Sequence, residues 1–141
     1  MLIDVTCAII IRDKRILVTR RSERMSMPLK WEFPGGKVEP GESPEDCLLR
    51  ELMEELNIRV NLLHKLDPQP YHYPDFSIRL LPFVATFGSG EIVLHEHMAY
   101  QWLTTDELPQ IDWAAADIPV LNAFLEYKAR TEAPQAEGKS A

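Results

Sequence analysis

The sequence predicts an α/β protein in which a mixed β-sheet is flanked by helices. Its 141 residues fit one domain, and 45% of them are apolar, which is enough to build a core. Runs rich in β-branched residues alternate with two stretches of helical periodicity, and no linker or repeat separates them. We expect a single domain at residues 1–129 and a disordered tail at 130–141, which is small, polar and without apolar periodicity.

The N-terminal part begins with two strands joined by a tight turn. Residues 3–11 are apolar and rich in β-branched side chains, which predicts a buried strand. Asp13 and Lys14 mark a turn. Three elements follow in order: a strand at 15–19, a charged and Met-rich loop at 20–30, and a short strand at 31–33.

The first helix is expected to begin after Ser43. Ser43 can cap the helix, and Pro44 suits the first helical position. The acids that follow favour the positive end of the helix dipole. Its apolar side is made of Leu48, Leu49, Leu52 and Leu56. Asn57 can enter the left-handed conformation that ends a helix.

The second half is expected to hold three more strands and a final helix. The strands lie near 59–66, 76–87 and 99–103, and the helix covers 118–129 with Asp117 as its cap. Pro82 cannot donate to a ladder, so we expect its run at a sheet edge or at a bulge.

Three acids of the first helix, Glu51, Glu54 and Glu55, follow the spacing i, i+3, i+4 and therefore share one face. Like charges at this spacing repel by roughly 0.2–0.5 kcal/mol per pair. They also lie near the helix C-terminus, where the dipole disfavours anions. Only Arg50 is interleaved with them. The pattern favours a site for a hard divalent ion, Mg²⁺ or Mn²⁺, over a solvated acidic face.

The same segment resembles the Nudix box. Gly36 is followed after five residues by Glu42, and after seven more by Arg50 and Glu51. The match continues through Glu54, Glu55 and Ile58, with Asn57 in place of the usual second glycine. Residues 19–21, 31–37 and 117–120 are similar to the MutT subgroup, and 95–102 and 113–117 to the bacterial CTP pyrophosphohydrolase branch.

This resemblance implies the Nudix α/β/α fold and a metal-dependent nucleoside triphosphate pyrophosphohydrolase. Such an enzyme releases nucleoside monophosphate and pyrophosphate and serves nucleotide-pool sanitation. CTP-type nucleotides and oxidised nucleotides such as 8-oxo-dGTP are both open as substrates. Two alternatives remain: hydrolysis of ADP-ribose or another nucleotide sugar, and a catalytically silent binding module. Retention of the box acids, Glu42 included, counts against the silent module.

The expected metal ligands are Glu51 and Glu55, with Glu54 binding directly or through water. A backbone carbonyl of Gly35 or Gly36 is expected to complete the set, because a residue without Cβ lets the main chain approach closely.

Two further residues are expected to serve catalysis. The resemblance implies that Glu96 binds metal or acts as the general base, and Glu51 is the other candidate for that base. It also implies that Arg50 orients a glutamate through a salt bridge, with Glu42 as a possible partner. His95 and His97, which flank Glu96, are expected to face solvent.

The candidate substrate contacts are Arg21 and Lys37 for phosphate, Phe33 for stacking on the base, and Asp117 for reading it. Asp117 stands where MutT carries an asparagine. An ionised aspartate only accepts hydrogen bonds, so it favours a base edge with amino or imino donors, such as the cytosine amino group or the N1/N2 edge of guanine. Tyr71, Tyr73, Phe76 and Trp113 are further possible stacking surfaces.

Composition argues against several other partners. The net charge is −7, from 15 basic and 22 acidic residues, and no basic run is present to hold a nucleic-acid backbone. The apolar run near 5–11 is too short to span a bilayer, so we expect a cytoplasmic protein without a membrane partner. Cys7 and Cys47 form no disulfide pattern and are expected to be small buried residues. The protein is expected to be a monomer or a homodimer.

Overall fold

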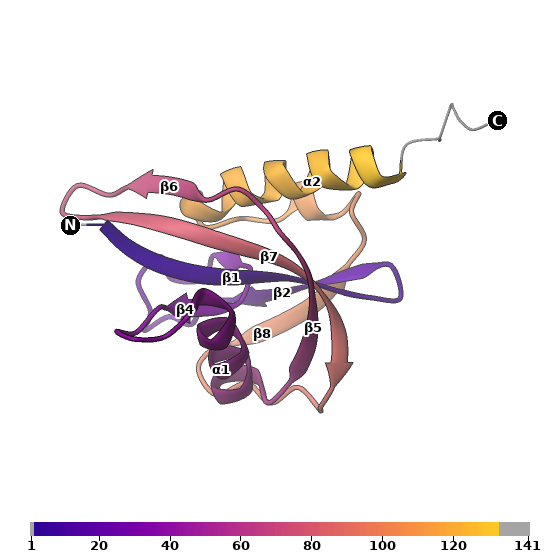
Figure 1. The fold of residues 1–141 in the computed structure, drawn as a ribbon, viewed down its shortest axis with the longest axis horizontal. Helices are drawn as coiled ribbons and strands as arrows, with labels where there is room; N and C mark the ends of the chain where they lie inside the picture. Colours follow the sequence, from indigo (N-terminus) through magenta and orange to yellow (C-terminus); the bar gives the residue numbers. More distant parts are fainter. Residues whose placement is uncertain (1, 133–141) are drawn as a thin grey trace.

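The computed structural model describes residues 2–132 and contains a mixed sheet with a helix on each side, which confirms the α/β class (Figure 1). The strands are β1 (Leu2–Arg12), β2 (Arg15–Arg20), β3 (Trp31–Glu32), β4 (Gly35–Lys37), β5 (Arg59–Lys65), β6 (Gln69–His72), β7 (Ser77–Ser89) and β8 (Ala99–Leu103). The helices are α1 (Pro44–Leu56) and α2 (Ile118–Glu132), with 3₁₀ turns η1 (Leu108–Gln110) and η2 (Ala115–Asp117).

The sheet is organised around β1 and β7, which pair in parallel from Leu2 beside Ser77 to Ile11 beside Thr86. The main strand order is β3-β2-β1-β7-β5. Outside this path, β4 pairs with β1, β6 with β7 and β8 with β2, and every pair other than β1–β7 is antiparallel. This arrangement places β4 beside the middle of β1, next to α1.

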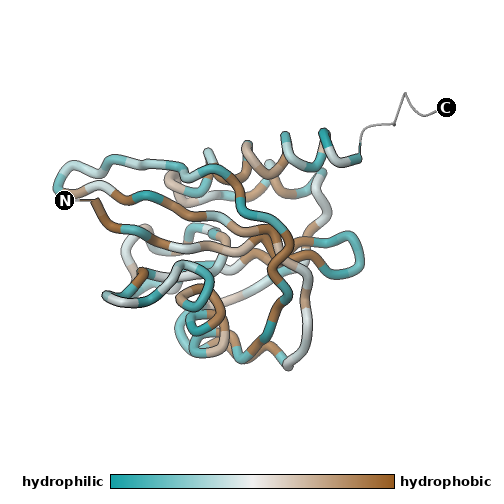
Figure 2. Tube along the Cα trace, viewed as in Figure 1, coloured by the Kyte–Doolittle hydropathy of each residue, from teal (hydrophilic) through white to brown (hydrophobic). Residues whose placement is uncertain are grey.

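Both faces of the sheet are buried, as the alternation along β1 shows. Cys7 and Ile9 belong to the cluster that includes Phe124 of α2. Ala8 and Ile10 belong to a second cluster with Leu52 of α1. Because successive strand side chains point to opposite faces, α1 and α2 must cover opposite faces, as Figure 1 shows. In Figure 2 the central strands are largely hydrophobic, while the β1–β2 turn is hydrophilic.

Helix α1 has both of its expected ends. The Ser43 side chain accepts a hydrogen bond from the Asp46 backbone N–H at 3.1 Å, and Pro44 occupies the first turn. Asn57 has φ 61° and ψ 36°, the left-handed conformation, and its N–H reaches the Met53 carbonyl at 3.1 Å. These caps determine where the acids of α1 lie relative to β4.

Three features differ from the sequence expectations. The expected edge position of Pro82 is wrong, because β7 is paired on both sides. Pro82 lies where the partner of β7 changes from β6 to β5, and only its carbonyl is used there, by the Leu66 N–H at 3.0 Å. Strands β4 and β6 were not predicted. Helix α2 continues to Glu132, and the rest of the expected tail, 133–141, lies outside the described residues.

Within residues 2–132, neither helix combines the length and the hydropathy that crossing a membrane requires.

Candidate active site

The acids of α1 face β4, and we call Glu51, Glu54 and Glu55 the acidic edge. Gly36 of β4 lies directly against it: a Cβ on Gly36 would be 2.2 Å from the carboxyl carbon of Glu51. The Glu51 side chain therefore occupies the space that a larger residue at position 36 would fill. Glu51 and Glu55 are half-buried, whereas the Glu54 side chain is 59% exposed.

Glu55 carries the strongest electrostatic signal of the site. Burial, then the negative charges of Glu51, Glu96 and Glu32, raise its pKa to about 8. Burial also raises the pKa of Glu51, which shares a hydrogen bond with Glu55. In the described part of the chain, no basic side chain forms an ion pair with Glu55. Two crowded, half-buried carboxylates, of which Glu55 has no basic partner, form a donor set that suits a hard divalent cation.

The acidic edge is not, however, arranged as a finished metal centre. Among the described residues, no three His, Cys, Asp or Glu side chains converge to hold an ion. The contacts of Arg50 supply a physical reason. Its Nη1 lies 3.2 Å from Glu51 Oε2 and 3.0 Å from Glu54 Oε1, so a guanidinium takes oxygens that a cation would use.

Arg50 also holds Glu42, which confirms the expected salt bridge. Nε and Nη2 of Arg50 lie 2.7 and 3.0 Å from the two carboxylate oxygens of Glu42. These hydrogen bonds lower the pKa of Glu42 to about 2. One planar side chain thus links the loop before α1 to two acids of the helix, a geometry that a guanidinium allows and an ammonium does not.

Replacing Arg50 with lysine is expected to lower kcat/KM for a nucleotide by about 10–100-fold, as is typical when a group that orients a metal ligand is changed. Lysine keeps the charge but cannot contact Glu42 with two nitrogens while holding Glu51. Steady-state kinetics check this result. The matched control is Arg130→Lys on α2, where an exposed ion pair with Glu126 spans 3.6 Å. Equal kcat/KM for wild type and Arg50→Lys would contradict the orienting role.

The two glycine carbonyls proposed as metal ligands are not equivalent. The carbonyl oxygen of Gly36 accepts hydrogen bonds from Thr6 Oγ1 at 3.1 Å and from Cys47 Sγ at 3.5 Å. Gly35 packs so closely on β1 that a Cβ there would lie 2.0 Å from the Thr6 carbonyl oxygen. Because the carbonyl oxygen of Gly36 already accepts two hydrogen bonds, the carbonyl of Gly35 is the better candidate for a metal ligand. Cys7 and Cys47 are buried and free, as expected.

A cavity of about 170 Å³ adjoins the acidic edge, and we call it the base cavity. Its wall includes Glu55 together with Glu32, Phe33, His97 and Asp117. Pockets for whole ligands usually measure about 300–1,000 Å³. The base cavity is therefore suited to one ring of a substrate, with the remainder of the molecule outside, beside the acids.

Two residues far apart in sequence meet at the floor of this cavity. The Phe33 N–H donates to Asp117 Oδ2 at 2.9 Å, and the Phe33 ring packs on Trp113 with centroids 4.7 Å apart. Burial, then the charge of Glu32, raises the pKa of Asp117 well above its ordinary value. The sequence suggested an ionised Asp117 that only accepts hydrogen bonds, whereas burial favours the neutral acid, which can also donate.

Sequence reasoning missed Glu32 and misplaced His97. The His97 side chain is 1% exposed, and its Nε2 lies 2.7 Å from Glu32 Oε2. The expectation that His97 faces solvent is wrong, because the loop folds back over β3. The other Glu32 oxygen accepts from Arg21 Nη1 at 2.6 Å. Glu32 lies between Trp31 and Phe33. Its position next to Phe33, a predicted stacking residue, is the sequence feature that could have identified it as a site residue.

Arg21 lies in the wall of the base cavity, but its guanidinium is already engaged. Besides Glu32, it donates to the Ser26 carbonyl and to Ser26 Oγ, the latter at 3.0 Å. The geometry therefore does not support the expected phosphate contact by Arg21. Lys37 is exposed at the cavity, with no ion pair among the described residues, and stays the candidate for that contact. Glu96 is exposed in the 90–98 loop, near enough to Glu55 to raise its pKa.

The other aromatic candidates do not line the base cavity. In the segment that joins β6 to β7, Tyr73 stacks on Phe76 with ring centroids 4.9 Å apart, and Tyr71 of β6 meets Tyr73 edge-on at 4.9 Å. Trp113 is buried and donates through its indole N–H to the Leu108 carbonyl at 2.7 Å. Its role is to support Phe33.

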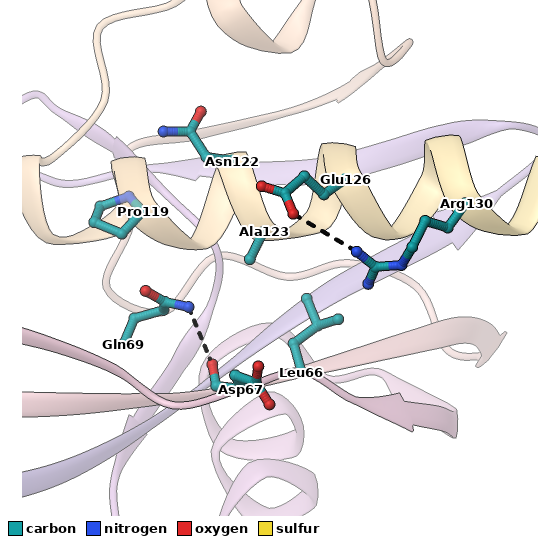
Figure 3. A pocket seen from close by; sticks show the side chains of 8 residues that line it. All are labelled: Leu66, Asp67, Gln69, Pro119, Asn122, Ala123, Glu126 and Arg130. Atoms are coloured by element: carbon teal, nitrogen blue, oxygen red, sulfur yellow. Dashed lines mark hydrogen bonds and ion pairs between the residues drawn. The ribbon is translucent and has the colours of Figure 1, made fainter.

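A larger hollow of about 380 Å³ lies between α2 and the segment that joins β5 to β6 (Figure 3). The Gln69 amide donates to the Asp67 carbonyl there at 3.3 Å, and the exposed pair of Glu126 and Arg130 faces the same hollow. No acid of α1 lines it. This hollow is larger than the base cavity, but the titratable groups with shifted pKa values gather at the smaller one.

Comparison with known proteins agrees with this geometry. Residues 1–124 match the family model described as NUDIX domain. The chain is 38% identical to the Escherichia coli K12 protein named CTP pyrophosphohydrolase, over 91% of this chain and 95% of that protein. It is 35% identical to the 8-oxo-dGTP diphosphatase of the same strain, over 77% and 84%.

Solved structures show the same fold. The solution structure of the E. coli ORF135 protein superposes with a TM-score of 0.83 at 36% identity, covering 94% of this chain and 95% of that one. The MutT structure from methicillin-resistant Staphylococcus aureus 252 has a TM-score of 0.73 at 39% identity, with coverages of 90% and 98%. Since the family model spans the sheet, the box and the first part of α2, the chain belongs to the NUDIX domain family.

Proposed function

We propose that this NUDIX hydrolase converts a nucleoside triphosphate into a nucleoside monophosphate and pyrophosphate, in cytoplasmic nucleotide-pool sanitation. The observation that carries the proposal is the contact between two sites: Glu55 of the acidic edge is also part of the wall of a cavity sized for one base. A nucleotide whose base enters the cavity has its phosphates beside the carboxylates. The relatives named CTP pyrophosphohydrolase and 8-oxo-dGTP diphosphatase support both substrate types.

The acidic edge fits a divalent cation, Mg²⁺ or Mn²⁺, and NUDIX hydrolases generally need one. Glu51 and Glu55 would hold it, together with the carbonyl of Gly35, and Glu54 and Glu96 lie on the same side. Bound there, the cation neutralises phosphate charge and lowers the pKa of a water molecule. The residues themselves then have two tasks: Arg50 keeps Glu51 in place, and Lys37 contacts phosphate.

The reaction itself needs a water oxygen to form a bond to phosphorus while the phosphoanhydride P–O bond breaks and pyrophosphate leaves. A carboxylate takes the proton of that water. Glu51 and Glu96 are the candidates, and the contacts favour Glu96. Glu51 is held by Arg50 at 3.2 Å, whereas Glu96 forms no ion pair within residues 2–132.

Glu32 and Asp117 are suited to read a base as a pair. Arg21 donates to one oxygen of Glu32, and the other oxygen lies 2.7 Å from His97 Nε2, which donates when that nitrogen carries the proton; the two contacts fix the carboxylate as an acceptor. Asp117 is buried and favours the neutral acid, which donates through its O–H. An acceptor beside a donor matches a base edge that carries an amino group beside a ring nitrogen, as cytosine does.

The base preference is expected to depend on pH through Asp117. Its pKa is raised, so the acid keeps its proton at lower pH and loses the O–H donor as pH rises through that pKa. The ratio of kcat/KM for CTP over UTP is therefore expected to fall toward alkaline pH. In Asp117→Asn the amide donates at every pH, so the ratio should stay level. A parallel decline in both enzymes would contradict this assignment.

One experiment tests the proposed function against its alternatives. The protein is incubated with Mg²⁺ and a panel of normal and oxidised nucleoside triphosphates, ADP-ribose and nucleotide sugars, and the products are separated. We expect monophosphate and pyrophosphate, and kcat/KM ranks the substrates. Sugar phosphate as the main product would favour the nucleotide-sugar reading. No turnover of any compound would favour a silent binding module.

A further inference from the structure

His97 is a deeply buried, titratable side chain in the wall of the base cavity, and the proposed reaction does not explain its position. Its side chain is 1% exposed, and Nε2 is 2.7 Å from Glu32 Oε2. Glu32 and His97 are separated by 65 residues in sequence, so this contact is made by the fold. It joins the 90–98 loop to β3.

The other ring nitrogen of His97 has no partner. Nδ1 is buried and makes no hydrogen bond within the described residues. A histidine that serves only to fill a core normally has both nitrogens satisfied, because an unpaired buried polar atom is costly. An aliphatic residue would fill the same space without that cost. The hydrogen bond with Glu32 is therefore the contact that favours histidine over an aliphatic residue at position 97.

The loop that carries His97 is also anchored on both sides. The His95 N–H donates to the Glu55 carbonyl of α1 at 3.2 Å, and the Met98 N–H donates to the Arg20 carbonyl of β2 at 3.0 Å. The charge of Glu96 raises the pKa of Glu55, while the next residue, His97, forms a hydrogen bond with Glu32. Adjacent residues thus serve the acidic edge and the base cavity.

We propose that His97 is a positioning residue for base specificity, which holds Glu32 as a fixed acceptor for the exocyclic amino group of a nucleobase. The inference rests on the proposed function and names the substrate feature that it selects. Arg21 holds one Glu32 oxygen and His97 the other, so the carboxylate cannot turn away from the cavity. Without His97, Glu32 keeps only the hydrogen bond from Arg21, and its carboxylate is free to rotate.

The test compares kcat/KM for CTP and UTP, which differ at the amino group. His97→Leu keeps the volume but removes the donor, and is expected to lower the CTP/UTP ratio by about tenfold, the usual effect of one hydrogen bond to a charged group. His97→Gln retains an N–H donor that can reach Glu32 and is expected to restore most of the ratio. His95→Leu, at an exposed histidine of the same loop, is the matched control and should keep the ratio.

The outcomes separate this inference from the proposed function. A purely structural role for His97 would lower kcat/KM for CTP and UTP equally, and an unchanged ratio in His97→Leu overturns the inference. A wild-type enzyme that hydrolyses both substrates without preference also overturns it, while the pyrophosphohydrolase activity stands. A wild-type enzyme that releases pyrophosphate from no triphosphate overturns the proposed function itself.

A second measurement uses the wild-type protein, so its result does not depend on whether a variant folds. In wild-type protein with ¹⁵N-labelled histidine, the His97 ring signals are followed by NMR during titration with CMP and with UMP. We expect CMP to shift them, because its amino group engages the Glu32 oxygens, and UMP to shift them less. Equal shifts with both nucleotides would overturn the inference.

Discussion

Replacing Glu55 with glutamine is expected to lower kcat/KM for a nucleoside triphosphate by more than about 100-fold, beyond the loss typical of residues that merely support a metal ligand. Glutamine keeps the shape of the side chain but lacks the charge that would hold a divalent cation. Since Glu55 is half-buried beside Glu51, no nearby exposed acid can replace it. Pyrophosphate release in the presence of saturating Mg²⁺ measures the loss.

The same substitution is expected to stabilise the metal-free protein at high pH. Glu55 has a folded-state pKa of about 8 against an ordinary value of 4.5. An acid whose pKa is raised by folding destabilises the folded state as pH rises above the pKa of the unfolded state. The destabilisation reaches its full size above the pKa of the folded state. Glu55→Gln removes this cost, so its Tm should exceed that of wild type above pH 8 and approach it near pH 4.5.

Activity lost together with stability gained is a signature that a damaged fold cannot produce. Glu126→Gln, at an exposed acid of α2, supplies the control and should change neither quantity appreciably. Added Mn²⁺ should raise the Tm of wild type and have less effect on Glu55→Gln. A less stable Glu55→Gln protein at alkaline pH would show that Glu55 contributes to the fold rather than to ion binding.

The substitution Gly36→Ala is expected to reduce kcat by about 100-fold, because small displacements of catalytic groups have costs of this order. The new Cβ would lie 2.5 Å and 2.6 Å from the two carboxylate oxygens of Glu51. Those atoms end a flexible side chain, so Glu51 moves and the backbone does not. The Tm should change little, while the metal concentration required for half-maximal activity rises.

The neighbouring glycine provides a contrast for that experiment. At Gly35 a Cβ would meet the backbone carbonyl oxygen of Thr6 at 2.0 Å, which no rotamer change relieves. Gly35→Ala should therefore lower the Tm, in addition to any effect on turnover. If Gly36→Ala retained wild-type kcat, the close contact between Gly36 and Glu51 would have no part in catalysis.

Local chemistry made one part of the site predictable. Ser43 and Asn57 determine the ends of α1, and within a helix the spacing of Glu51 and Glu55 fixes their common face. The pairing of Arg50 with Glu42 spans eight residues and followed from the box pattern. The helix ends and the shared face need no knowledge of the tertiary structure, because local chain geometry determines them, whereas the Arg50–Glu42 pair was implied by the resemblance to the Nudix box.

The base cavity could not be derived in the same way. Phe33 and Asp117 are 84 residues apart, and Glu32 and His97 are 65 apart. These contacts depend on how β3, the 90–98 loop and η2 approach one another in three dimensions. The raised pKa of Asp117 could not be anticipated for the same reason: it follows from burial, which a sequence motif does not contain.

The most direct test of the account is a crystal structure with Mn²⁺ and a non-hydrolysable CTP analogue, with the metal located by anomalous scattering. We expect a peak about 2.1 Å from carboxylate oxygens of Glu51 and Glu55, the distance typical of hard octahedral cations, with the cytosine ring in the base cavity. A manganese peak away from the acidic edge, or a base bound outside the cavity, would contradict the account.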